Sequence, residues 1–323
     1  MYAAILADIP IAVKILVTGG AGFIGSHVAR ALLADGHTVH VLDDLSHGQR
    51  SHVPAAAVFH QLDLRDAEVR ALWQRERYSV LVHHAAQIDV RRSAEAPAAD
   101  ADVNIQGFLH MMEAGRAQGL TKVLFASTGG ALYGEPEYTP QDEAHPIRPL
   151  SPYGIAKHTA EQYLDFYRRT HGIAYVALRY ANVYGPRQNA QGAAGVIATF
   201  AHHALTGIPA TIYGDGTQTR DYVYVGDVVD ANRLALAYPD SGVFNIGTGV
   251  ETSVNQLHTV LADVSPGSIP PRYAPARRGE QYRSVLSYAH AQQRLGWQPR
   301  TTLRDGLQAT VAWYAAQLAE ETA

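Results

Sequence analysis

The sequence predicts an α/β fold, a doubly wound parallel sheet joined to a smaller, interleaved α/β lobe. Short β-branched apolar runs alternate with alanine-rich helical patterns through about the first 180 residues. The first run leads into a glycine-rich turn at 18–25, and after Asn182 the rhythm gives way to frequent glycine and proline. Continuous apolar strands separated by helices are typical of parallel sheets that are covered on both faces.

The individual elements follow from the same patterns. The segment 26–36 is predicted to be a helix that ends at Gly36. Ser151 and Pro152 open a second helix as its N-cap and first-turn residue. The apolar runs expected to form strands are residues 13–18, 37–44, 57–64, 79–86, 122–128, 173–183 and 242–249. Ligands of such open sheets bind at the carboxyl ends of the strands.

Composition narrows the classes of function. The 323 residues, 47% hydrophobic and 17% charged, indicate a folded globular protein. A net charge of −4 argues against nucleic acid or an acidic membrane as the main partner. The chain has no cysteine, which excludes disulfides, thiolate chemistry and sulfur-ligated zinc. Its 16 histidines show no metal-ligand spacing, and we expect no metal.

The turn TGGAGFIG, Thr18–Gly25, lies directly between the first strand and the first helix. Gly19, Gly22 and Gly25 permit a tight turn, close approach of the backbone to a pyrophosphate, and close packing of helix on strand. The helix N-terminus offers free N–H groups to the phosphates. This context predicts a Rossmann-type dinucleotide site.

Carboxylates at the ends of the next two strands indicate which dinucleotide is bound. Asp43 and Asp44 follow the glycine turn by about twenty residues, where a carboxylate accepts hydrogen bonds from the adenosine ribose. A negative charge there disfavours a 2′-phosphate, so NAD is expected rather than NADP. Asp63, at the end of the third strand, is expected to meet the adenine.

The stretch SPYGIAKHTAEQY places Tyr153 and Lys157 one turn apart on one face of a helix. A phenol with its usual pKa is a weak base at neutral pH. A neighbouring ammonium group and the positive nicotinamide of NAD both favour the phenolate. Together with the strand that ends in Ser127-Thr128, this pair predicts proton transfer beside the nicotinamide.

Three features occur here in the order that is typical of one family: the glycine turn, the strand that ends in Ser127-Thr128, and the Tyr153–Lys157 pair. They resemble the extended short-chain dehydrogenases/reductases of the NAD-dependent epimerase/dehydratase family. Within this family the resemblance is greatest to the UDP-glucose 4-epimerases. The resemblance extends from Lys14 to Trp297. The segments that carry it are DDLSHG (43–48), HHAAQIDV (83–90), DVNIQG (102–107), RYANVYGPRQ (179–188), DGTQTRDYVYVGDV (215–228) and FNIGTG (244–249).

The resemblance implies that Tyr153, Lys157 and Thr128 or Ser127 form the catalytic set. In the usual pattern the catalytic hydroxyl lies four residues before the tyrosine of a Tyr-Gly pair, where this chain has Gly129. We expect the Gly129-Gly130 pair to shift or loosen the end of this strand and Thr128 to take the role, with Ser127 as the alternative. The residues implied to line the cofactor are Gly19, Gly22, Phe23, Ile24, Gly25, Asp43, Asp44, Leu45, Ser46, Gly48, Asp63, Leu64, His84, Ala85, Ala86, Gln87, Asn104, Tyr153, Lys157 and Tyr180.

The same stretch distinguishes between reactions. The family's sugar dehydratases carry an Asp-Glu pair after the hydroxyl residue, and its decarboxylating members keep a glutamate there. Gly129 and Gly130 supply no group for proton transfer. The resemblance therefore implies a 4-epimerase that oxidises and re-reduces C4 of UDP-glucose or UDP-galactose. A uronate epimerase, another nucleotide-sugar epimerase or a ketoreductase is the alternative, and an NAD-sensing binding protein is the non-enzyme alternative.

The remaining expectations concern the substrate and the architecture. Ser284 is small where relatives restricted to plain hexoses are often bulky, which predicts that the N-acetylhexosamine pair is also accepted. The sequence is compatible with either UDP or dTDP as the nucleotide. The residues implied to bind the substrate are Asn182, Val196, Tyr213, Arg220, Arg277, Glu280 and Ser284.

We expect residues 13–181 and 222–249 to form the NAD-binding domain and 182–221 and 250–323 the substrate lobe. Residues 1–12 carry Asp8 and Pro10, lack a basic start, and are interpreted as a leader. A cytoplasmic location is the default. The resemblance also implies a homodimer formed through the helices around 100–117 and 153–170.

Overall fold

The computed structural model describes residues 12–190, 195–265, 267, 269–276 and 281–321. The predicted leader, residues 1–12, lies outside the described residues except for Ala12. No helix of the described residues is long and apolar enough to cross a membrane.

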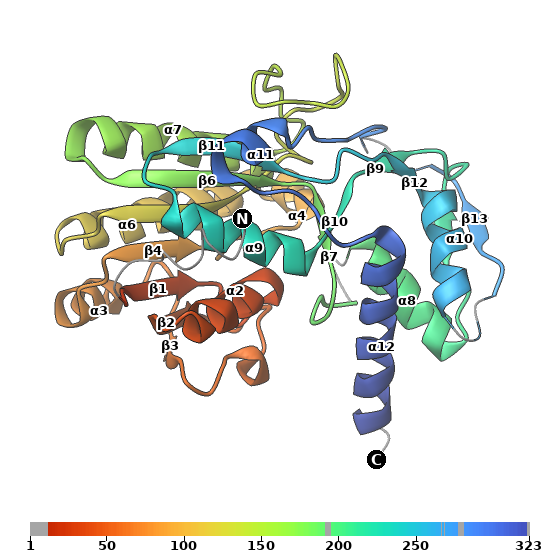
Figure 1. Cartoon of the computed structure of the whole chain (residues 1–323), viewed down its shortest axis with the longest axis horizontal. Helices are drawn as coiled ribbons and strands as arrows, with labels where there is room; N and C mark the ends of the chain where they lie inside the picture. Colours follow the sequence, from red (N-terminus) through yellow and green to blue (C-terminus); the bar gives the residue numbers. More distant parts are fainter. Residues whose placement is uncertain (1–11, 191–194, 266, 268, 277–280, 322–323) are drawn as a thin grey trace.

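A seven-stranded sheet forms the centre of the molecule, in the order β11-β6-β5-β4-β1-β2-β3 (Figure 1). Every pairing in it is parallel. The expected doubly wound fold is therefore confirmed. The strands are β1 (Lys14–Thr18), β2 (Thr38–Asp43), β3 (Val58–Gln61), β4 (Val80–His83), β5 (Lys122–Thr128), β6 (Ala174–Tyr180) and β11 (Gly242–Ile246).

One predicted strand, 173–183, is divided in two by the structure. Its first part is β6, and its second part is β7 (Asn182–Tyr184), which pairs with β10 (Tyr222–Tyr224) in a separate two-stranded sheet. The backbone changes partner at this point, because Ala181 N–H donates to Ile246 in β11 while Asn182 N–H donates to Asp221. Apart from Arg179 and Asn182 the segment 173–183 is apolar or aromatic, so the pattern was interpreted as one strand.

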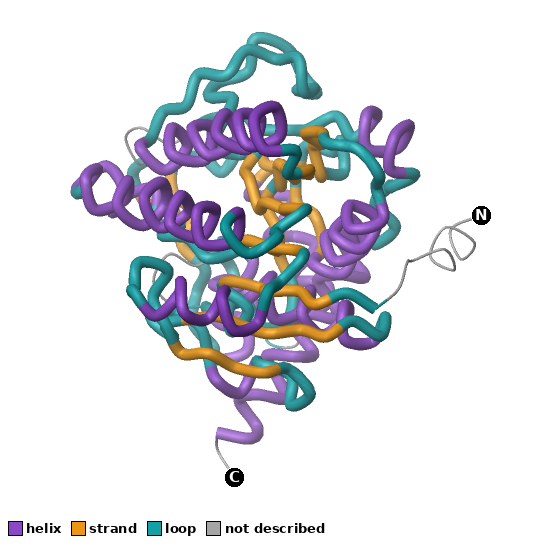
Figure 2. Tube along the Cα trace, turned by 90° about the vertical axis from the view of Figure 1, so that its left-hand side faces the viewer, coloured by secondary structure: helices purple, strands orange, loops and turns teal. Residues whose placement is uncertain are grey.

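Helices cover both faces of the sheet (Figure 2). Alternate side chains of β1 point to opposite faces and therefore identify the helices on each side. Ile15 and Val17 belong to the core cluster that contains side chains of α2 (Phe23–Ala34) and α9 (Val225–Ala237). Leu16 belongs to the cluster on the other face. The helices there are α3 (Glu68–Glu76), α6 (Phe108–Arg116) and α7 (Pro152–His171).

The carboxyl end of the sheet is joined to a smaller lobe with its own core cluster. This cluster contains side chains of α8 (Val196–Thr206), α10 (Val254–Val264) and α12 (Leu303–Glu321). The lobe also holds β8 (Thr211–Tyr213) paired with β13 (Arg272–Ala274). Strand β9 (Thr219–Arg220) pairs with β12 (Thr252–Ser253).

The remaining elements bear on the predicted division into domains. Helix α11 (Ala289–Leu295), expected in the substrate lobe, contributes Ala291 and Leu295 to the core cluster of β1. Residues 289–297 therefore pack with the sheet. The short elements are η1 (Arg50–His52), α4 (Val90–Glu95), α5 (Pro97–Ala101) and the π-helical segment η2 (Asp102–Gly107).

Candidate active site

The glycine turn has the geometry of a phosphate cradle. Gly19 adopts φ +66°, and a Cβ atom there would lie 2.6 Å from Ala85 N. A Cβ atom at Gly25 would lie 2.2 Å from Gly19 O, so the turn and α2 approach each other as only glycine permits. Gly22 is the N-cap of α2, and the N–H groups of Phe23 and Ile24 begin the helix. A helix N-terminus that has no capping side chain favours an anion.

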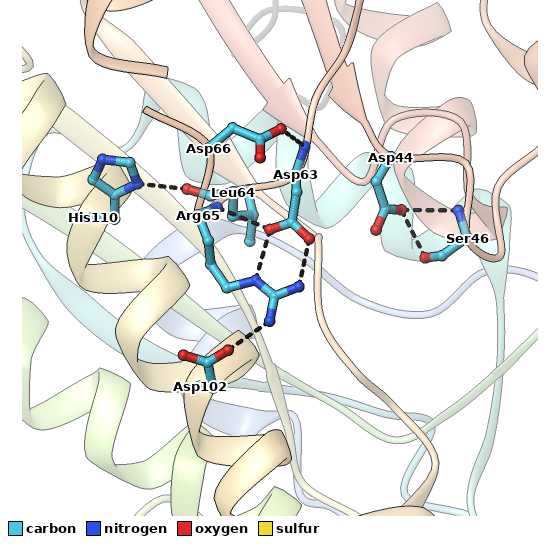
Figure 3. Close-up of polar contacts among 8 residues, drawn as sticks. All are labelled: Asp44, Ser46, Asp63, Leu64, Arg65, Asp66, Asp102 and His110. Carbon is cyan, nitrogen blue, oxygen red and sulfur yellow. Dashed lines mark hydrogen bonds and ion pairs between the residues drawn. The ribbon is translucent and has the colours of Figure 1, made fainter. Parts of the chain in front are cut away.

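The two carboxylates after β2 have different surroundings. Asp43 is buried and accepts hydrogen bonds from Ala21 N and Leu45 N, both at 2.9 Å. Burial raises the pKa of Asp43, and these N–H groups oppose the rise. Asp44 is exposed and accepts from Ser46 N at 2.9 Å and Ser46 Oγ at 2.6 Å (Figure 3). Asp43 therefore holds the glycine turn, while Asp44 lies open beside it.

Gly48, which follows Ser46 and His47, is also a glycine for a steric reason. A Cβ atom at Gly48 would lie 2.8 Å from Asp43 Oδ1 and 2.9 Å from Ala21 Cβ. The loop after β2 therefore packs directly on the glycine turn.

The end of β3 contains an ion-pair network that was not predicted from the sequence (Figure 3). Arg65 donates to both carboxylate oxygens of Asp63, at 2.8 and 2.6 Å, and to Asp102 of η2 at 2.5 Å. The backbone oxygen of Leu64 is bonded to His110 Nδ1 of α6 at 2.7 Å. The expected adenine contact, Asp63, is thus already held by a guanidinium group. The position of Arg65, two residues after Asp63, was the only signal of this network in the sequence.

The end of β4 leads into the loop expected to line the cofactor. His83 is buried and bonds to Thr18 Oγ1 at 2.9 Å, whereas His84 is half-buried and lies 3.4 Å from the Tyr180 hydroxyl. One histidine thus faces the core, and its neighbour is half-buried beside Tyr180. The loop continues through Ala85 and Ala86.

Asn104 fixes the end of this loop. Its Oδ1 accepts from Gln87 N at 3.0 Å and its Nδ2 donates to Gln87 O at 2.9 Å. Asp100, a buried residue that was not predicted, accepts from both Asn104 Nδ2 and Gln87 Nε2. Asn104 lies in the π-helical segment η2, a conformation that is frequent at functional sites. Asp100 lies one turn before Asn104, which was the available sequence signal.

Tyr153 and Lys157 project from the first turns of α7. The Ser151 side chain caps this helix by accepting from Gly154 N, as predicted. Lys157 Nζ lies 5.9 Å from the centre of the Tyr153 ring and donates to Ala126 O at 2.8 Å. Burial lowers the pKa of Lys157 to about 8. Burial, together with the Asp100 carboxylate, raises the pKa of Tyr153, so the ammonium group alone does not produce a phenolate.

The two candidate hydroxyls differ in their surroundings. Ser127 is buried, and its Oγ donates to Glu161 Oε1 at 2.6 Å. Thr128 is half-buried at the end of β5, and its Oγ1 accepts from Ala131 N at 3.2 Å. Thr128 therefore remains the better placed group at the edge of the sheet.

The glycine pair after Thr128 has a structural explanation. A Cβ atom at Gly129 would lie 2.4 Å from Leu286 Cδ1, and Gly129 N donates to Tyr180 O at 2.8 Å. Gly129 therefore continues the pairing of β5 with β6 and makes room for Leu286. We expected the pair to shift or loosen the strand end, and the structure corrects this for Gly129.

The described substrate candidates come from separate segments of the chain. Asn182 is exposed at the start of β7, and Val196 opens α8. Tyr213 ends β8, and Arg220 donates to Thr219 O at 2.7 Å. Ser284 is buried. The two other predicted residues, Arg277 and Glu280, lie outside the described residues. Over the described part of the chain, no three histidine or carboxylate side chains gather as metal ligands.

Comparison with known proteins agrees with this geometry. Residues 15–247 match the NAD dependent epimerase/dehydratase family. The UDP-glucose 4-epimerase of Mycolicibacterium smegmatis is 43% identical over 307 residues, with 93% of this chain and 98% of the relative covered. The structure of Thermotoga maritima UDP-glucose 4-epimerase with UDP-glucose is 45% identical, with a TM-score of 0.93 and coverage of 94% and 99%.

Two further solved structures are similar. Thermus thermophilus UDP-glucose 4-epimerase in complex with NAD is 44% identical, with a TM-score of 0.88 and coverage of 93% and 98%. The UDP-N-acetylglucosamine 4-epimerase of Methanobrevibacter ruminantium, in complex with UDP-N-acetylmuramic acid, is 32% identical, with a TM-score of 0.90 and coverage of 95% and 100%.

Proposed function

The chain belongs to the NAD dependent epimerase/dehydratase family, and from that premise we propose that it is a nucleotide-sugar 4-epimerase that interconverts UDP-glucose and UDP-galactose. One observation carries the proposal. Lys157, whose Nζ lies 5.9 Å from the centre of the Tyr153 ring on α7, donates to Ala126 O of β5; this strand ends at Thr128, and the next two residues are Gly129 and Gly130. Elimination or decarboxylation needs further acid–base groups there. Transient oxidation at C4 needs only one group that moves a proton.

The residues present fit NAD. The glycine turn packs so closely on the loop after β4 and on the start of α2 that Cβ atoms at Gly19 and Gly25 would collide with the backbone, as the turn of a dinucleotide site requires, and Asp43 and Asp44 disfavour a 2′-phosphate. Within the described residues, two buried atoms at this edge, His84 Nδ1 and Asp100 Oδ2, have no hydrogen-bond partner. We propose that NAD is held by the residues that the family resemblance implies for the cofactor. When bound, NAD accepts the hydride from C4 and returns it.

The protein's own groups move the proton. Tyr153 takes the proton of the O4 hydroxyl as the C4–H bond breaks and the C4=O bond forms. Lys157, together with the positive charge of an oxidised nicotinamide, stabilises the phenolate against the burial that raises the pKa of Tyr153. Thr128 donates a hydrogen bond to O4. After the 4-keto sugar has turned over, Tyr153 returns the proton as hydride reaches the opposite face.

The sugar must turn while the nucleotide stays bound, and the smaller lobe is suited to hold the nucleotide. We propose that Arg220 and Arg277 bind the diphosphate, because guanidinium groups match phosphate geometry. Asn182, Val196, Tyr213 and Glu280 complete the site in this proposal. The division into an NAD-binding domain (13–181, 222–249) and a substrate lobe (182–221, 250–323) remains a prediction, apart from the packing of α11.

Ser284 favours a second substrate pair. Its small side chain leaves volume for an N-acetyl group at C2, and a similar structure is a UDP-N-acetylglucosamine 4-epimerase. We therefore propose that UDP-N-acetylglucosamine is also epimerised. Epimerisation of a uronate, or a net reduction by a ketoreductase, is the alternative within the same family.

We also propose that the protein is a homodimer in the cytoplasm and acts in galactose metabolism. Helix α7 exposes Ile155, Tyr163 and Phe166, whose side chains would be covered by a second copy. Light scattering on the purified protein measures its mass, and Phe166→Glu should shift a dimer toward the monomer. A monomeric wild-type protein would contradict this part of the proposal.

The test of the function is proton NMR of the purified protein with UDP-glucose, UDP-N-acetylglucosamine and UDP-glucuronic acid in separate tubes. A galacto anomeric signal establishes 4-epimerisation, and the tube in which it appears names the sugar. The matched control is Tyr153→Phe, which keeps the ring and removes the proton-transfer group. An unchanged spectrum in every tube, with and without added NAD, favours the ketoreductase or the NAD-sensing protein.

A further inference from the structure

Three polar side chains lie side by side across the sheet below the end of β5. In the strand register, Ser127 of β5 is opposite Arg179 of β6, and Arg179 is opposite Asn245 of β11. Residues in register point to the same face of a sheet. All three are buried, at 3%, 5% and 0% exposure. The face is that of α7, because both Ser127 and Arg179 bond to Glu161 on that helix.

Glu161 joins this row to the helix that carries Tyr153 and Lys157. Arg179 donates to both Glu161 oxygens, at 3.0 and 2.6 Å. Glu161 lies one turn after Lys157, so α7 holds two successive residues of β5: Lys157 bonds to Ala126 O and Glu161 to the Ser127 hydroxyl. Burial would raise the pKa of Glu161, but the hydrogen bonds and positive charge of Arg179 and the hydrogen bond from Ser127 lower it to about 2.

The other end of the row reaches the loop after β5 and, through it, residues 285–287. Arg179 Nη1 donates to the Tyr133 hydroxyl at 2.8 Å, and that hydroxyl donates to Asn245 Oδ1 at 2.7 Å. Asn245 Nδ2 donates to Gln141 O at 3.1 Å. Gln141 pairs through its backbone with Val285 and Ser287, next to Ser284. Tyr133, Asn245 and Gln141 are all fully buried.

Burial of an ion pair is costly, and apolar residues of similar volume usually stabilise a fold as well or better. The uninterrupted connection suggests another role for this one. We propose that Glu161, Arg179, Tyr133 and Asn245, here termed the cross-sheet relay, are positioning residues that hold the catalytic end of β5 at a fixed separation from the substrate segment 284–287. This inference rests on the proposed epimerase function.

The reaction of a 4-epimerase is unusually sensitive to a change in the distance between its catalytic groups and its substrate-binding segment. Its keto sugar must rotate between the two hydride transfers without leaving reach of Tyr153. A looser site would release the keto sugar after the first transfer and leave reduced cofactor on the protein. The relay therefore controls what fraction of oxidations ends in epimerisation. A displacement of about 1 Å between the catalytic groups and the sugar is enough to lower that fraction.

The test is Tyr133→Phe, which keeps the ring but removes the hydroxyl that joins Arg179 to Asn245. The control is Tyr78→Phe, another fully buried tyrosine whose hydroxyl bonds to His40 at 2.9 Å, distant from the relay. We measure epimerisation by NMR and accumulation of reduced nicotinamide by near-ultraviolet absorbance. The ratio of abandoned oxidations to epimerisations should rise about tenfold in Tyr133→Phe and stay at the wild-type value in Tyr78→Phe.

A second readout does not depend on activity. The amide hydrogens of Gln141 and Ser287, which join the loop to the substrate segment, should exchange faster in Tyr133→Phe than in Tyr78→Phe. Asn245→Ser breaks the relay at its other end and should reproduce both effects if Tyr133→Phe does not fold. Unchanged ratio and exchange in the folded variants overturn the relay. A wild-type protein that epimerises no sugar, with faster exchange in the variants, overturns only the proposed function.

Discussion

Ser127 and Thr128 are consecutive residues whose side chains point to opposite faces of β5. Ser127 Oγ donates to the buried Glu161, and Thr128 Oγ1 lies at the half-buried end of the strand next to Ala131 N. Successive side chains of a strand alternate between its faces, so only one of the two hydroxyls can meet the sugar in a given register.

Thr128→Val should therefore reduce turnover by about a hundredfold, because it removes a hydrogen bond to O4 that strengthens as charge develops on that oxygen. Ser127→Ala should lower turnover by less, through the position of β5 alone. Initial rates of UDP-glucose epimerisation compare the two variants. An active Thr128→Val beside an inactive Ser127→Ala would exchange the roles of the two residues.

The sheet and its cofactor end were predictable because they depend on local patterns. Apolar runs specify parallel strands, and the glycine turn specifies its own backbone conformation. A domain boundary after residue 181 was predicted, but the end of the strand there was not, since the change of backbone partner depends on Asp221, forty residues away. The ion pairs of Arg65 and Arg179 were not predicted for the same reason. An arginine in a sequence resembles any surface charge until the carboxylates that surround it are known.

Lys157→Met should abolish epimerisation yet stabilise the fold. Burial lowers the pKa of Lys157 from 10.5 to about 8, so the folded state binds its proton less tightly than the unfolded state does. The cost is fully present below pH 8 and amounts to about 3 kcal/mol at most. Between pH 8 and 10.5 only the unfolded state keeps the proton, so this cost disappears as pH rises.

Urea unfolding of wild type and Lys157→Met, both freed of dinucleotide, measures the difference in stability. The advantage of the variant should be largest at pH 7 and should shrink from pH 8 to 10. A variant that is less stable than wild type at pH 7 would show that the hydrogen bond to Ala126 O outweighs the burial of the charge.

Arg65→Gln should weaken retention of NAD. Arg65 joins the end of β3 to η2 through Asp63 and Asp102, and its removal leaves both carboxylates uncompensated beside an anionic dinucleotide. We expect NAD to dissociate about tenfold faster, with a smaller effect at high salt, because salt screens the exposed charges. Trapping of released NAD by a coupled dehydrogenase follows the rate. Arg116→Gln, which breaks the exposed pair with Glu113, is the control and should leave the rate unchanged.

Gly129→Ser would restore a hydroxyl at the position usual in relatives, but we expect it to damage the protein. A Cβ atom at residue 129 meets Leu286 at 2.4 Å, whereas at Gly130 the nearest atom, Asn182 Oδ1, is 3.6 Å away. Overpacking of this kind costs about 1–3 kcal/mol. Gly129→Ala should therefore lower the free energy of unfolding by that amount, and Gly130→Ala should leave it nearly unchanged.

The double variant Gly129→Ala/Leu286→Ala identifies the cause. If Leu286 is the obstacle, the alanine at 129 should cost much less once Leu286 has been truncated, and a double-mutant cycle measures the difference. Equal costs in both backgrounds would mean that residue 129 is glycine for its backbone conformation. If the cycle shows coupling, the chain uses Thr128 because Leu286 occupies the space that a side chain at 129 would need.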